Sequence, residues 1–248
     1  MQTMLQQNQP PGVPPLRLTG ERTLPDVPAE NYWFRRHLAV YEWIAQRCAG
    51  LDVVDMACGE GYGVDVLARR ARRVTGVDAN PETYEHARLK YTRPGVRFVR
   101  DMIERFSEPC DAVLCLQTIE HVQDPEAVLR HFKGMCDTAY VSTPNLLTLA
   151  PPGADKSDNP WHIREYRAEE FRALCASVFE HIELFGVFPA RVLRVHELAL
   201  QAGWDQVHSK LGITRRFYDR FTPAITAADF ALRPGPLERA LDFVAVLR

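Results

Sequence analysis

The feature that most constrains the fold is a glycine-rich segment directly after a short apolar run. The run LDVVDMA (51–57) is followed by CGEGYG (58–63) and then by an amphipathic stretch over 64–71. Three alternating glycines at a strand-to-helix junction cost backbone entropy, which favours a turn where the backbone approaches a ligand. A simple tight turn is the alternative. We interpret the segment as a strand, a ligand-binding turn and a helix.

The alternation of short apolar runs and helical periods continues along the chain. Runs typical of strands follow at 72–78, 96–101, 110–117, 138–143, 179–187 and 241–248. Helical periods lie at 28–50, 81–91, 125–135 and 167–178. Strands separated by helices of about ten residues specify right-handed crossovers and a parallel sheet covered on both faces. The sequence therefore predicts an open, doubly wound α/β domain with seven strands.

Two segments fall outside this alternation. Residues 1–20 contain clustered Gln and Pro without apolar periodicity, so we predict a disordered tail before a domain that spans 21–248. Residues 188–237 are too many for a simple connection between two strands, and we predict an inserted cap. Its aromatic residues, Trp204 and Tyr218, would offer a stacking surface to an acceptor.

Composition excludes several classes of protein. The chain has 30 basic and 32 acidic side chains in 248 residues, which argues against a broad nucleic-acid-binding face. No apolar run approaches the roughly 18 residues of a membrane helix, and the first residues do not resemble a signal peptide. Six cysteines form no CxxC pair, so we expect buried thiols in a reducing compartment. We therefore expect a cytoplasmic protein, with its oligomeric state left open.

Acidic residues end the second and third predicted strands. Asp78 lies nineteen residues after Gly59, where a carboxylate can accept hydrogen bonds from both ribose hydroxyls of a nucleoside. Capping of the helix that starts at Pro81 is the alternative role for Asp78. Asp101 and Met102 pair a carboxylate with an apolar side chain, which suits an exocyclic amine and the face of a base. A surface position is the alternative for Asp101.

The segments VVDMACGEGYG, VTGVDAN and VRFVRDMI, in this order and spacing, resemble the cofactor motifs of class I S-adenosylmethionine-dependent methyltransferases. The resemblance implies a mostly parallel, Rossmann-like sheet with an antiparallel last strand and a helical cap insertion. Asp55 would support the glycine turn, Asp78 would bind ribose, and Asp101 with Met102 would frame adenine. The implied cofactor-binding residues are Asp55, Ala57, Gly59, Gly61, Gly63, Asp78, Ala79, Asp101, Met102 and Gln117. Ala57 departs from the family pattern, which has Gly there.

The end of the fourth predicted strand places Gln117, Glu120 and His121 at the mouth of the cofactor crevice. A His can take the proton of an attacking hydroxyl, and a Glu can orient it or bind a cation. The alternative is a Glu at a helix start and a surface His. The segment resembles ubiquinone-biosynthesis O-methyltransferases, in which a Glu-x-x-Glu-His pattern is associated with a divalent cation. Glu120 and His121 would hold Mg²⁺ here, although Gln117 is a weaker ligand than Glu.

The segment NPWHIREYRAEEF (159–171) resembles the same branch and bacterial sugar methyltransferases, which makes His162 a second candidate base. A charged helix start is the alternative. GERTLPDVPAENYWFRRH (20–37) resembles the start of actinobacterial methyltransferases, including those linked to methylated polysaccharides. Tyr32, Arg35 and His37 could line the cofactor mouth there, or simply pack.

The predicted function is O-methylation of a sugar, glycan or other small-molecule hydroxyl by in-line displacement from S-adenosylmethionine, with His121 as the base. A quinone precursor is the alternative acceptor. A nicotinamide-dependent oxidoreductase is a remote alternative, because its fingerprint is G-x-G-x-x-G and these glycines alternate. A cofactor-binding module without catalytic activity is the other remote alternative.

Overall fold

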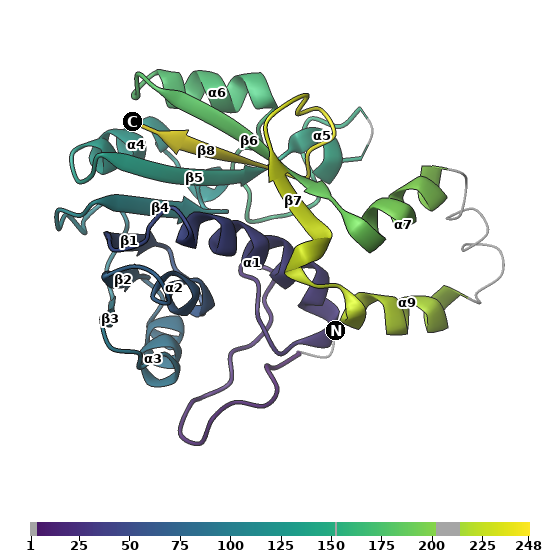
Figure 1. Cartoon of the computed structure of the whole chain (residues 1–248), viewed down its shortest axis with the longest axis horizontal. Helices are drawn as coiled ribbons and strands as arrows, with labels where there is room; N and C mark the ends of the chain where they lie inside the picture. Colours follow the sequence, from purple (N-terminus) through teal and green to yellow (C-terminus); the bar gives the residue numbers. More distant parts are fainter. Residues whose placement is uncertain (1–3, 152, 202–213) are drawn as a thin grey trace.

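A computed structural model of the chain describes residues 4–151, 153–201 and 214–248, and its strands and helices alternate along most of that length (Figure 1). The strands are β1 (Asp52–Met56), β2 (Arg73–Val77), β3 (Val96–Val99), β4 (Ala112–Leu116), β5 (Thr138–Pro144), β6 (Ile182–Pro189), β7 (Phe230–Arg233) and β8 (Asp242–Leu247). The helices are α1 (Asn31–Ala45), α2 (Tyr62–Leu67), α3 (Pro81–Lys90), α4 (Pro125–Lys133), α5 (Leu146–Leu149), α6 (Ala168–Ala176), α7 (Arg191–Gln201) and α9 (Thr214–Ala224). Short 3-10 helices are η1 (Pro28–Glu30), η2 (Ile119–His121) and η3 (Ala227–Asp229).

One sheet forms the centre of the described structure, in the order β3-β2-β1-β4-β5-β8-β6-β7. Neighbours from β3 to β5 pair in parallel, whereas β8 runs antiparallel to β5 and β6. The predicted doubly wound fold and its antiparallel last strand are confirmed. The predicted strand number is wrong, because β7 adds an eighth strand by antiparallel pairing with β6. This four-residue strand lies inside the predicted insertion and is too short to display a period of its own.

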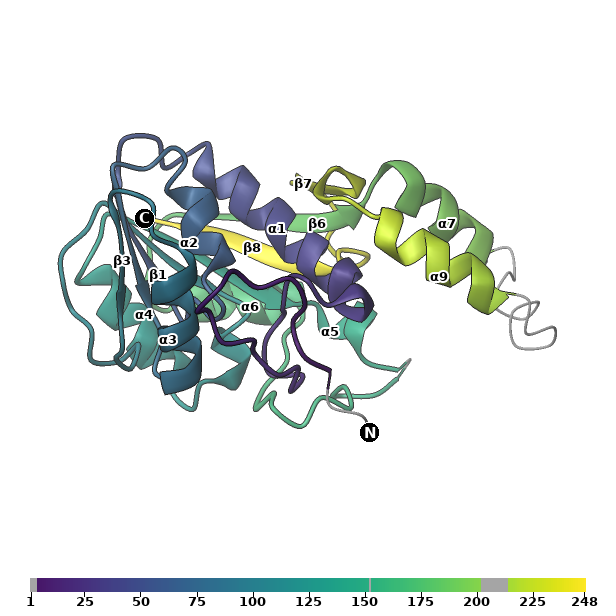
Figure 2. The ribbon, with the colours of Figure 1, turned by 90° about the horizontal axis from the view of Figure 1, so that it is seen from below.

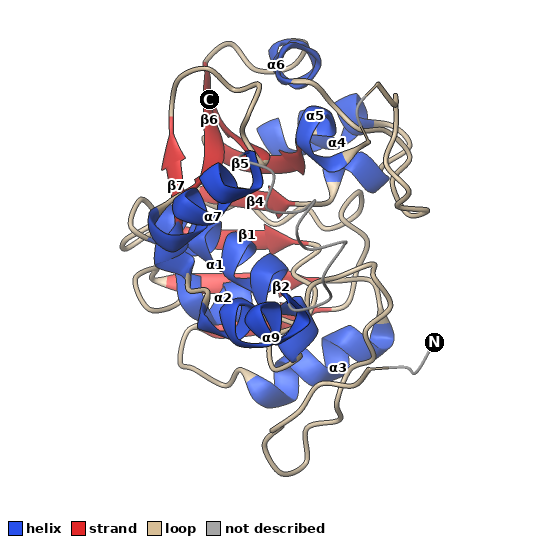
Figure 3. Ribbon diagram, turned by 90° about the vertical axis from the view of Figure 1, so that its right-hand side faces the viewer, coloured by secondary structure: helices blue, strands red, loops and turns tan. Residues whose placement is uncertain are grey.

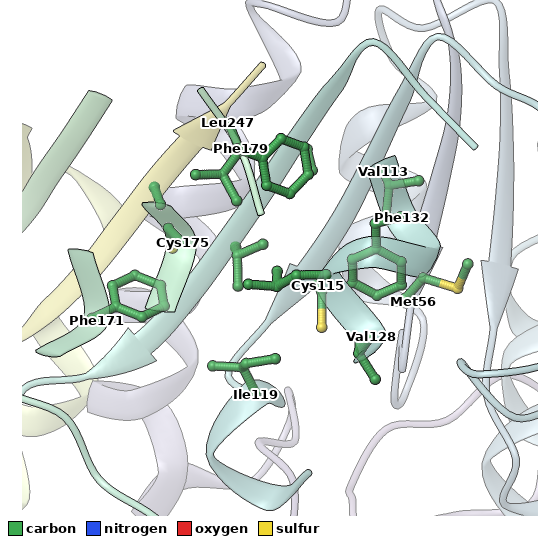
Figure 4. Close-up of a cluster of buried hydrophobic side chains, with 14 of the residues drawn as sticks. Met56, Val113, Cys115, Ile119, Val128, Phe132, Phe171, Cys175, Phe179 and Leu247 are labelled. Atoms are coloured by element: carbon green, nitrogen blue, oxygen red, sulfur yellow. The ribbon is translucent and has the colours of Figure 1, made fainter. Parts of the chain in front are cut away.

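Apolar side chains fill both faces of the sheet, and helices cover them on either side (Figure 3). The cluster under α4 and α6 includes Met56, Val113, Cys115, Phe132, Phe171 and Leu247 (Figure 4). The cluster under α1 and α2 includes Ile44, Val53, Leu67, Leu114 and Val244. Burial on both faces explains why these strands are continuous apolar runs rather than alternating ones.

A buried ion pair fixes α1 to the last strand. The Arg36 Nε donates to Asp242 Oδ2 at 2.5 Å, and its Nη2 donates to the Leu241 carbonyl at 2.6 Å and to Asp242 Oδ1. Both side chains are almost completely buried. A charge in such a place requires its partner, so this pair sets the position of α1 on the sheet.

Residues 4–20, which make up most of the predicted disordered tail, are packed against the rest of the domain. Residues 4–20 pack beside α1 and α3 (Figure 2), and Gln6, Val13 and Leu16 are buried. The Pro14 carbonyl accepts a hydrogen bond from His86 Nδ1 of α3 at 2.7 Å. These partners lie far along the chain, which is why the local composition of residues 1–20 does not reveal the packing.

Within the predicted insertion 188–237, helices α7 and α9 lie together and project beyond the end of the sheet (Figures 1 and 2). The Tyr218 hydroxyl of α9 is hydrogen-bonded to His196 Nε2 of α7 at 2.8 Å. Trp204 lies outside the described residues. Residues 188–189 and 230–233 belong to strands, so the helical part of the insertion is shorter than predicted. None of the helices in the described residues is both long and apolar enough to cross a membrane.

Candidate active site

A cleft of about 1540 Å³ opens where the carboxyl ends of β1, β2 and β4 meet. Ala57 and Gly59 line it after β1, Asp78 and Ala79 after β2, and Gln117 after β4. Ligands of open α/β sheets bind in this position because the strand order reverses there and leaves a crevice between neighbouring loops. The cleft therefore collects the sequence motifs that follow three separate strands.

The three glycines of the turn have different structural roles. Gly59 lines the cleft with φ of +57°, and a Cβ at that position would meet nothing within 4 Å. A Cβ at Gly61 would lie 2.9 Å from the Cβ of Ala87, and one at Gly63 would lie 2.2 Å from the ring of Tyr41. Packing therefore requires Gly61 and Gly63, whereas Gly59 leaves open space for a ligand. Neither Gly61 nor Gly63 lines the cleft.

Asp78 joins the second strand to the turn. Its Oδ2 accepts from the Gly59 backbone N–H at 2.9 Å and its Oδ1 accepts from the Asn80 N–H at 2.9 Å. Asn80, not Asp78, caps α3, since the Asn80 Oδ1 accepts from the N–H groups of Glu82 and Thr83. Each carboxylate oxygen of Asp78 keeps a further lone pair for a ligand.

Asp55 lies behind the cleft rather than on its surface. Its side chain is buried and accepts a hydrogen bond from the Tyr41 hydroxyl at 3.1 Å. Burial raises the pKa of Asp55 to about 8, and Asp78 adds to this rise while the Tyr41 hydrogen bond opposes it. Asp55 therefore supports the turn from below through Tyr41, the residue that also packs against Gly63.

The predicted adenine residues separate in the structure. Met102 lines the cleft, whereas Asp101 does not, and the Asp101 Oδ1 accepts from the Met102 backbone N–H at 2.8 Å. Ile103 and His131 line the cleft as well, and the His131 Nε2 donates to the Phe106 carbonyl at 2.7 Å. The apolar half of the predicted pair thus reaches the cleft.

Gln117 and Glu120 both follow β4. Gln117 has φ of +51°, and its side-chain amide donates to Ser142 Oγ at 3.1 Å. Glu120 is buried, and its Oε2 accepts from Thr143 Oγ1 at 3.1 Å. Burial raises the pKa of Glu120 to about 8. Gln117 is therefore held against β5, while Glu120 lies as a desolvated carboxyl group at the cleft wall.

His121 has a defined tautomer. Its Nδ1 lies 2.8 Å from the carbonyl oxygen of Trp161, which can only accept, so Nδ1 carries the proton. Burial lowers the pKa of His121, which favours the neutral ring. In that ring the lone pair resides on Nε2. Since His121 lines the cleft, this nitrogen is suited to take a proton from a bound ligand.

Both ring nitrogens of His162 are hydrogen-bonded to other side chains of the protein. Its Nδ1 lies 2.6 Å from Glu165 Oε1, and its Nε2 lies 3.0 Å from the Asn159 side-chain nitrogen. Asn159 cannot be turned around, because its Oδ1 accepts from the Trp161 N–H at 3.0 Å. Nε2 therefore accepts and Nδ1 donates. The rings of His121 and His162 lie edge to face, 5.0 Å between centroids.

One group in the described residues has metal-binding spacing. Ligand atoms of Glu120, His121 and His162 all lie within 4.8 Å of one another. The set offers one carboxylate oxygen and two imidazole nitrogens. The structure thus adds His162 to the pair that the sequence motif indicates, and it turns Gln117 toward Ser142 instead.

Sequence reasoning missed Glu60, which lies inside the glycine turn. Its buried carboxylate receives hydrogen bonds, between 2.6 and 3.1 Å, from Gln6 Nε2, the Tyr62 N–H, His86 Nε2, Lys90 Nζ and Tyr91 OH. Burial alone would raise the pKa of Glu60, but the hydrogen bonds from His86 and Lys90 hold it below the ordinary value. The only sequence signal was a charged residue between two glycines.

Residues before and within α1 also line the cleft. Gly20, Glu21, Arg22 and Thr23 form one part of the wall, and the side chain of Arg22 is only 14% exposed. The Thr23 hydroxyl is hydrogen-bonded to His37 Nδ1 at 3.1 Å, and His37 also lines the cleft. Tyr32 and Arg35 do not; Tyr32 packs on Phe230 instead.

Comparisons with known proteins point to one family of enzymes. A family model described as a methyltransferase domain matches residues 54–137. A Mycolicibacterium smegmatis protein named "Probable S-adenosylmethionine-dependent methyltransferase" is 38% identical over 247 residues, covering 93% of this chain and 94% of the relative. A ubiquinone biosynthesis O-methyltransferase of Erwinia tasmaniensis is 36% identical over 97 residues, which cover 36% of this chain and 40% of that enzyme.

The fold has solved counterparts. The crystal structure of an S-adenosylmethionine-dependent methyltransferase from Thermotoga maritima superposes with a TM-score of 0.58 at 16% identity, and the match covers 88% of this chain and 93% of that one. At this identity the likeness concerns the fold. It agrees with the α/β architecture described above.

Proposed function

The chain belongs to the class I S-adenosylmethionine-dependent methyltransferases, and we propose that it methylates a hydroxyl oxygen of a sugar or glycan. The observation that carries the proposed chemistry is the hydrogen bond from His121 Nδ1 to the Trp161 carbonyl, because it leaves the lone pair of a neutral imidazole on Nε2. A hydroxyl group loses its proton when it is methylated, so it needs such a base.

The cofactor would lie along the turn and the end of β2. Open space at Gly59 and the remaining lone pairs of Asp78 suit a ribose, and Met102 suits the face of adenine. When bound, S-adenosylmethionine supplies a methyl group on a positively charged sulfur and leaves as the neutral thioether S-adenosylhomocysteine. Ala57, Ala79 and Gln117 would line the rest of this part of the cleft.

His121 would act as the general base. As the new oxygen–carbon bond forms and the sulfur–carbon bond breaks, Nε2 takes the proton of the hydroxyl group. Glu120 would orient the acceptor, since its raised pKa lets it donate a hydrogen bond near neutral pH. His162 suits a positioning role better than that of a base, because both its ring nitrogens have protein partners.

The donor set does not suit Mg²⁺. That ion prefers six oxygen ligands, whereas Glu120, His121 and His162 offer a single carboxylate and two imidazoles. A cation at His162 Nε2 would also have to displace Asn159. Glu120, His121 and His162 are therefore assigned to hydrogen bonding and proton transfer rather than to Mg²⁺.

Methyl transfer from labelled S-adenosylmethionine tests the proposal. The acceptors are a panel of mono- and oligosaccharides, simple phenols that resemble quinone precursors, and amines. We expect transfer to a sugar hydroxyl, and a His121→Ala variant that loses at least 100-fold in kcat while it binds S-adenosylhomocysteine as before. His181→Ala is the matched control, since His181 is exposed and lies directly before β6. Transfer only to phenols or amines would refute the sugar acceptor, and equal loss of turnover and cofactor binding in His121→Ala would refute the base.

A further inference from the structure

The cleft is larger than one ligand requires. Its volume of about 1540 Å³ exceeds the roughly 300–1,000 Å³ of an ordinary small-molecule site. The part that the cofactor residues do not line is bounded by the start of α1 and by the loop 157–162. A second, sizeable ligand can therefore bind beside the cofactor.

Two tryptophans outside the predicted cofactor residues line the cleft. Trp33 on α1 is 38% exposed and Trp161 in the loop is 48% exposed, although both are large apolar side chains. The Arg36 guanidinium lies 4.9 Å from the centroid of the Trp33 ring, and Arg36 is itself held by Asp242. Both indoles therefore offer apolar surface to a ligand from well-anchored positions.

Trp161 is also tied to the reacting end of the site. Its carbonyl accepts from His121 Nδ1, and its N–H donates to Asn159 Oδ1, which belongs to the same network as His162. A ligand that contacts the Trp161 ring is thereby brought beside His121. These backbone bonds do not depend on the indole, so a substitution of the side chain can leave His121 in place.

Glu30 brings a carboxylate to the same region. It lies in η1 just before α1 and lines the cleft. Among the described residues its carboxylate has no hydrogen-bond or ion-pair partner, and burial raises its pKa. A partly desolvated carboxylate without a partner gains from a ligand that donates hydrogen bonds to it.

We propose that Glu30, Trp33 and Trp161 form the acceptor subsite and that they recognise a sugar ring. This inference rests on the proposed function and extends it by naming the residues that set its specificity. The C–H face of a sugar ring packs on an indole, and its hydroxyls donate to a carboxylate. A simple phenol has one hydroxyl, which must lie at His121 to be methylated, so it would use the indoles and have no hydroxyl left to donate to Glu30. An amine would use Glu30 as a charge, which distinguishes it from a neutral sugar.

Binding and kinetics of three single variants of the full chain test the subsite. The wild type and variants, saturated with S-adenosylhomocysteine, are titrated with glucose, mannose and galactose oligosaccharides while tryptophan fluorescence is followed. We expect Trp33→Ala, Trp161→Ala and Glu30→Ala each to raise the sugar Kd and the acceptor KM about tenfold, with unchanged affinity for S-adenosylhomocysteine. Glu30→Gln should retain most of the affinity for a neutral sugar.

Trp43→Phe is the matched control, because Trp43 packs against Phe185 and Arg47 and does not line the cleft. Acceptor KM values that stay at the wild-type level in the three variants overturn the subsite, and so does a wild type that binds none of the sugars. If Glu30→Gln loses as much acceptor affinity as Glu30→Ala, the proposed sugar acceptor is refuted in favour of a cationic acceptor. Methyl transfer to a phenol at wild-type rates in all variants refutes the subsite and leaves the methyltransferase itself intact. Failure to bind S-adenosylhomocysteine would instead refute the proposed function.

Discussion

The side-chain amide of Gln6 donates a hydrogen bond to the carboxylate of Glu60 at 3.0 Å, which joins the N-terminal segment to the centre of the glycine turn. The Gln6 Nε2 also donates to the Pro25 carbonyl, and its Oε1 accepts from the Leu16 N–H. One buried amide thus holds two parts of the segment together and fastens both to the turn. Residues 20–23, which line the cleft, lie between these anchors.

Replacement of Gln6 by Ala should destabilise the protein and loosen the cleft wall. The substitution leaves buried polar groups without their partner, so we expect a loss of about 1–3 kcal/mol in the free energy of unfolding. Affinity for S-adenosylhomocysteine should fall as well. Urea denaturation and calorimetric titration measure the two effects, with exposed Gln7→Ala as the control. If Gln6→Ala leaves both the free energy of unfolding and the affinity for S-adenosylhomocysteine unchanged, the segment does not support the site.

Alanine at Gly63 should mainly reduce stability, whereas alanine at Gly59 should mainly reduce cofactor affinity. A Cβ at Gly63 overlaps the Tyr41 ring, so Gly63→Ala should cost about 1–3 kcal/mol or more of stability. Gly59→Ala meets no atom, and its strained φ should cost only about 1 kcal/mol while cofactor affinity falls. Denaturation curves and titration with S-adenosylhomocysteine separate the two. A Gly63→Ala variant as stable as the wild type would show that the Tyr41 ring can move aside and that packing does not require Gly63.

The stability of the ligand-free protein should decrease as the pH rises from about 4.5 to about 8. Glu120 and Asp55 stay protonated in the folded state up to about pH 8, whereas their ordinary pKa values are 4.5 and 3.8. As the pH rises, the unfolded chain releases these protons before the folded protein does. The contribution of the two groups to the free energy of unfolding is therefore complete at a pH below their ordinary pKa values, and it is lost as the pH rises to about 8.

Each group adds a slope of at most about 1.4 kcal/mol per pH unit. Glu120→Gln should therefore flatten the dependence of the unfolding free energy on pH, measured by urea denaturation at pH 5, 6.5 and 8. Exposed Glu169→Gln serves as the control. Equal slopes in Glu120→Gln and the wild type would contradict the raised pKa of Glu120.

The acid limb of kcat should lie below pH 6.5, the ordinary pKa of a histidine. Burial lowers the pKa of His121, so the ring stays neutral and able to accept a proton into mildly acidic solution. A profile of kcat from pH 5 to pH 8 with saturating acceptor measures this limb. A midpoint above pH 7 would speak against His121 as the base.

Removal of one partner from the Arg36–Asp242 pair should be far more harmful than removal of both. Asp242→Ala leaves a buried guanidinium unpaired, and we expect a loss of about 3–5 kcal/mol in the free energy of unfolding. The double variant Arg36→Met with Asp242→Leu should recover most of this loss. Thermal and urea denaturation of the three proteins provide the comparison. A double variant as unstable as Asp242→Ala would show that the pair contributes more than mutual neutralisation.

The sequence alone was sufficient to predict the doubly wound sheet, the glycine turn after β1 and the position of Asp78 at the end of β2. Each of these has a local signal: apolar runs and helical periods identify the elements, and glycines or an acidic residue at a strand end indicate a turn that binds a ligand. Parallel strands then bring their carboxyl ends to one edge of the sheet, which explains why residues after β1, β2 and β4 share the cleft.

Tertiary structure alone decided the rest. Gly63 is required by a Tyr41 ring 22 residues earlier, the N-terminal segment is held by Glu60 and His86, and strand β7 exists because β6 lies beside it. The proton on His121 Nδ1 is likewise determined by a carbonyl 40 residues away. The free energy of these features comes from contacts between distant parts of the chain. No window of neighbouring residues contains that information, because it arises only when folding brings the partners together.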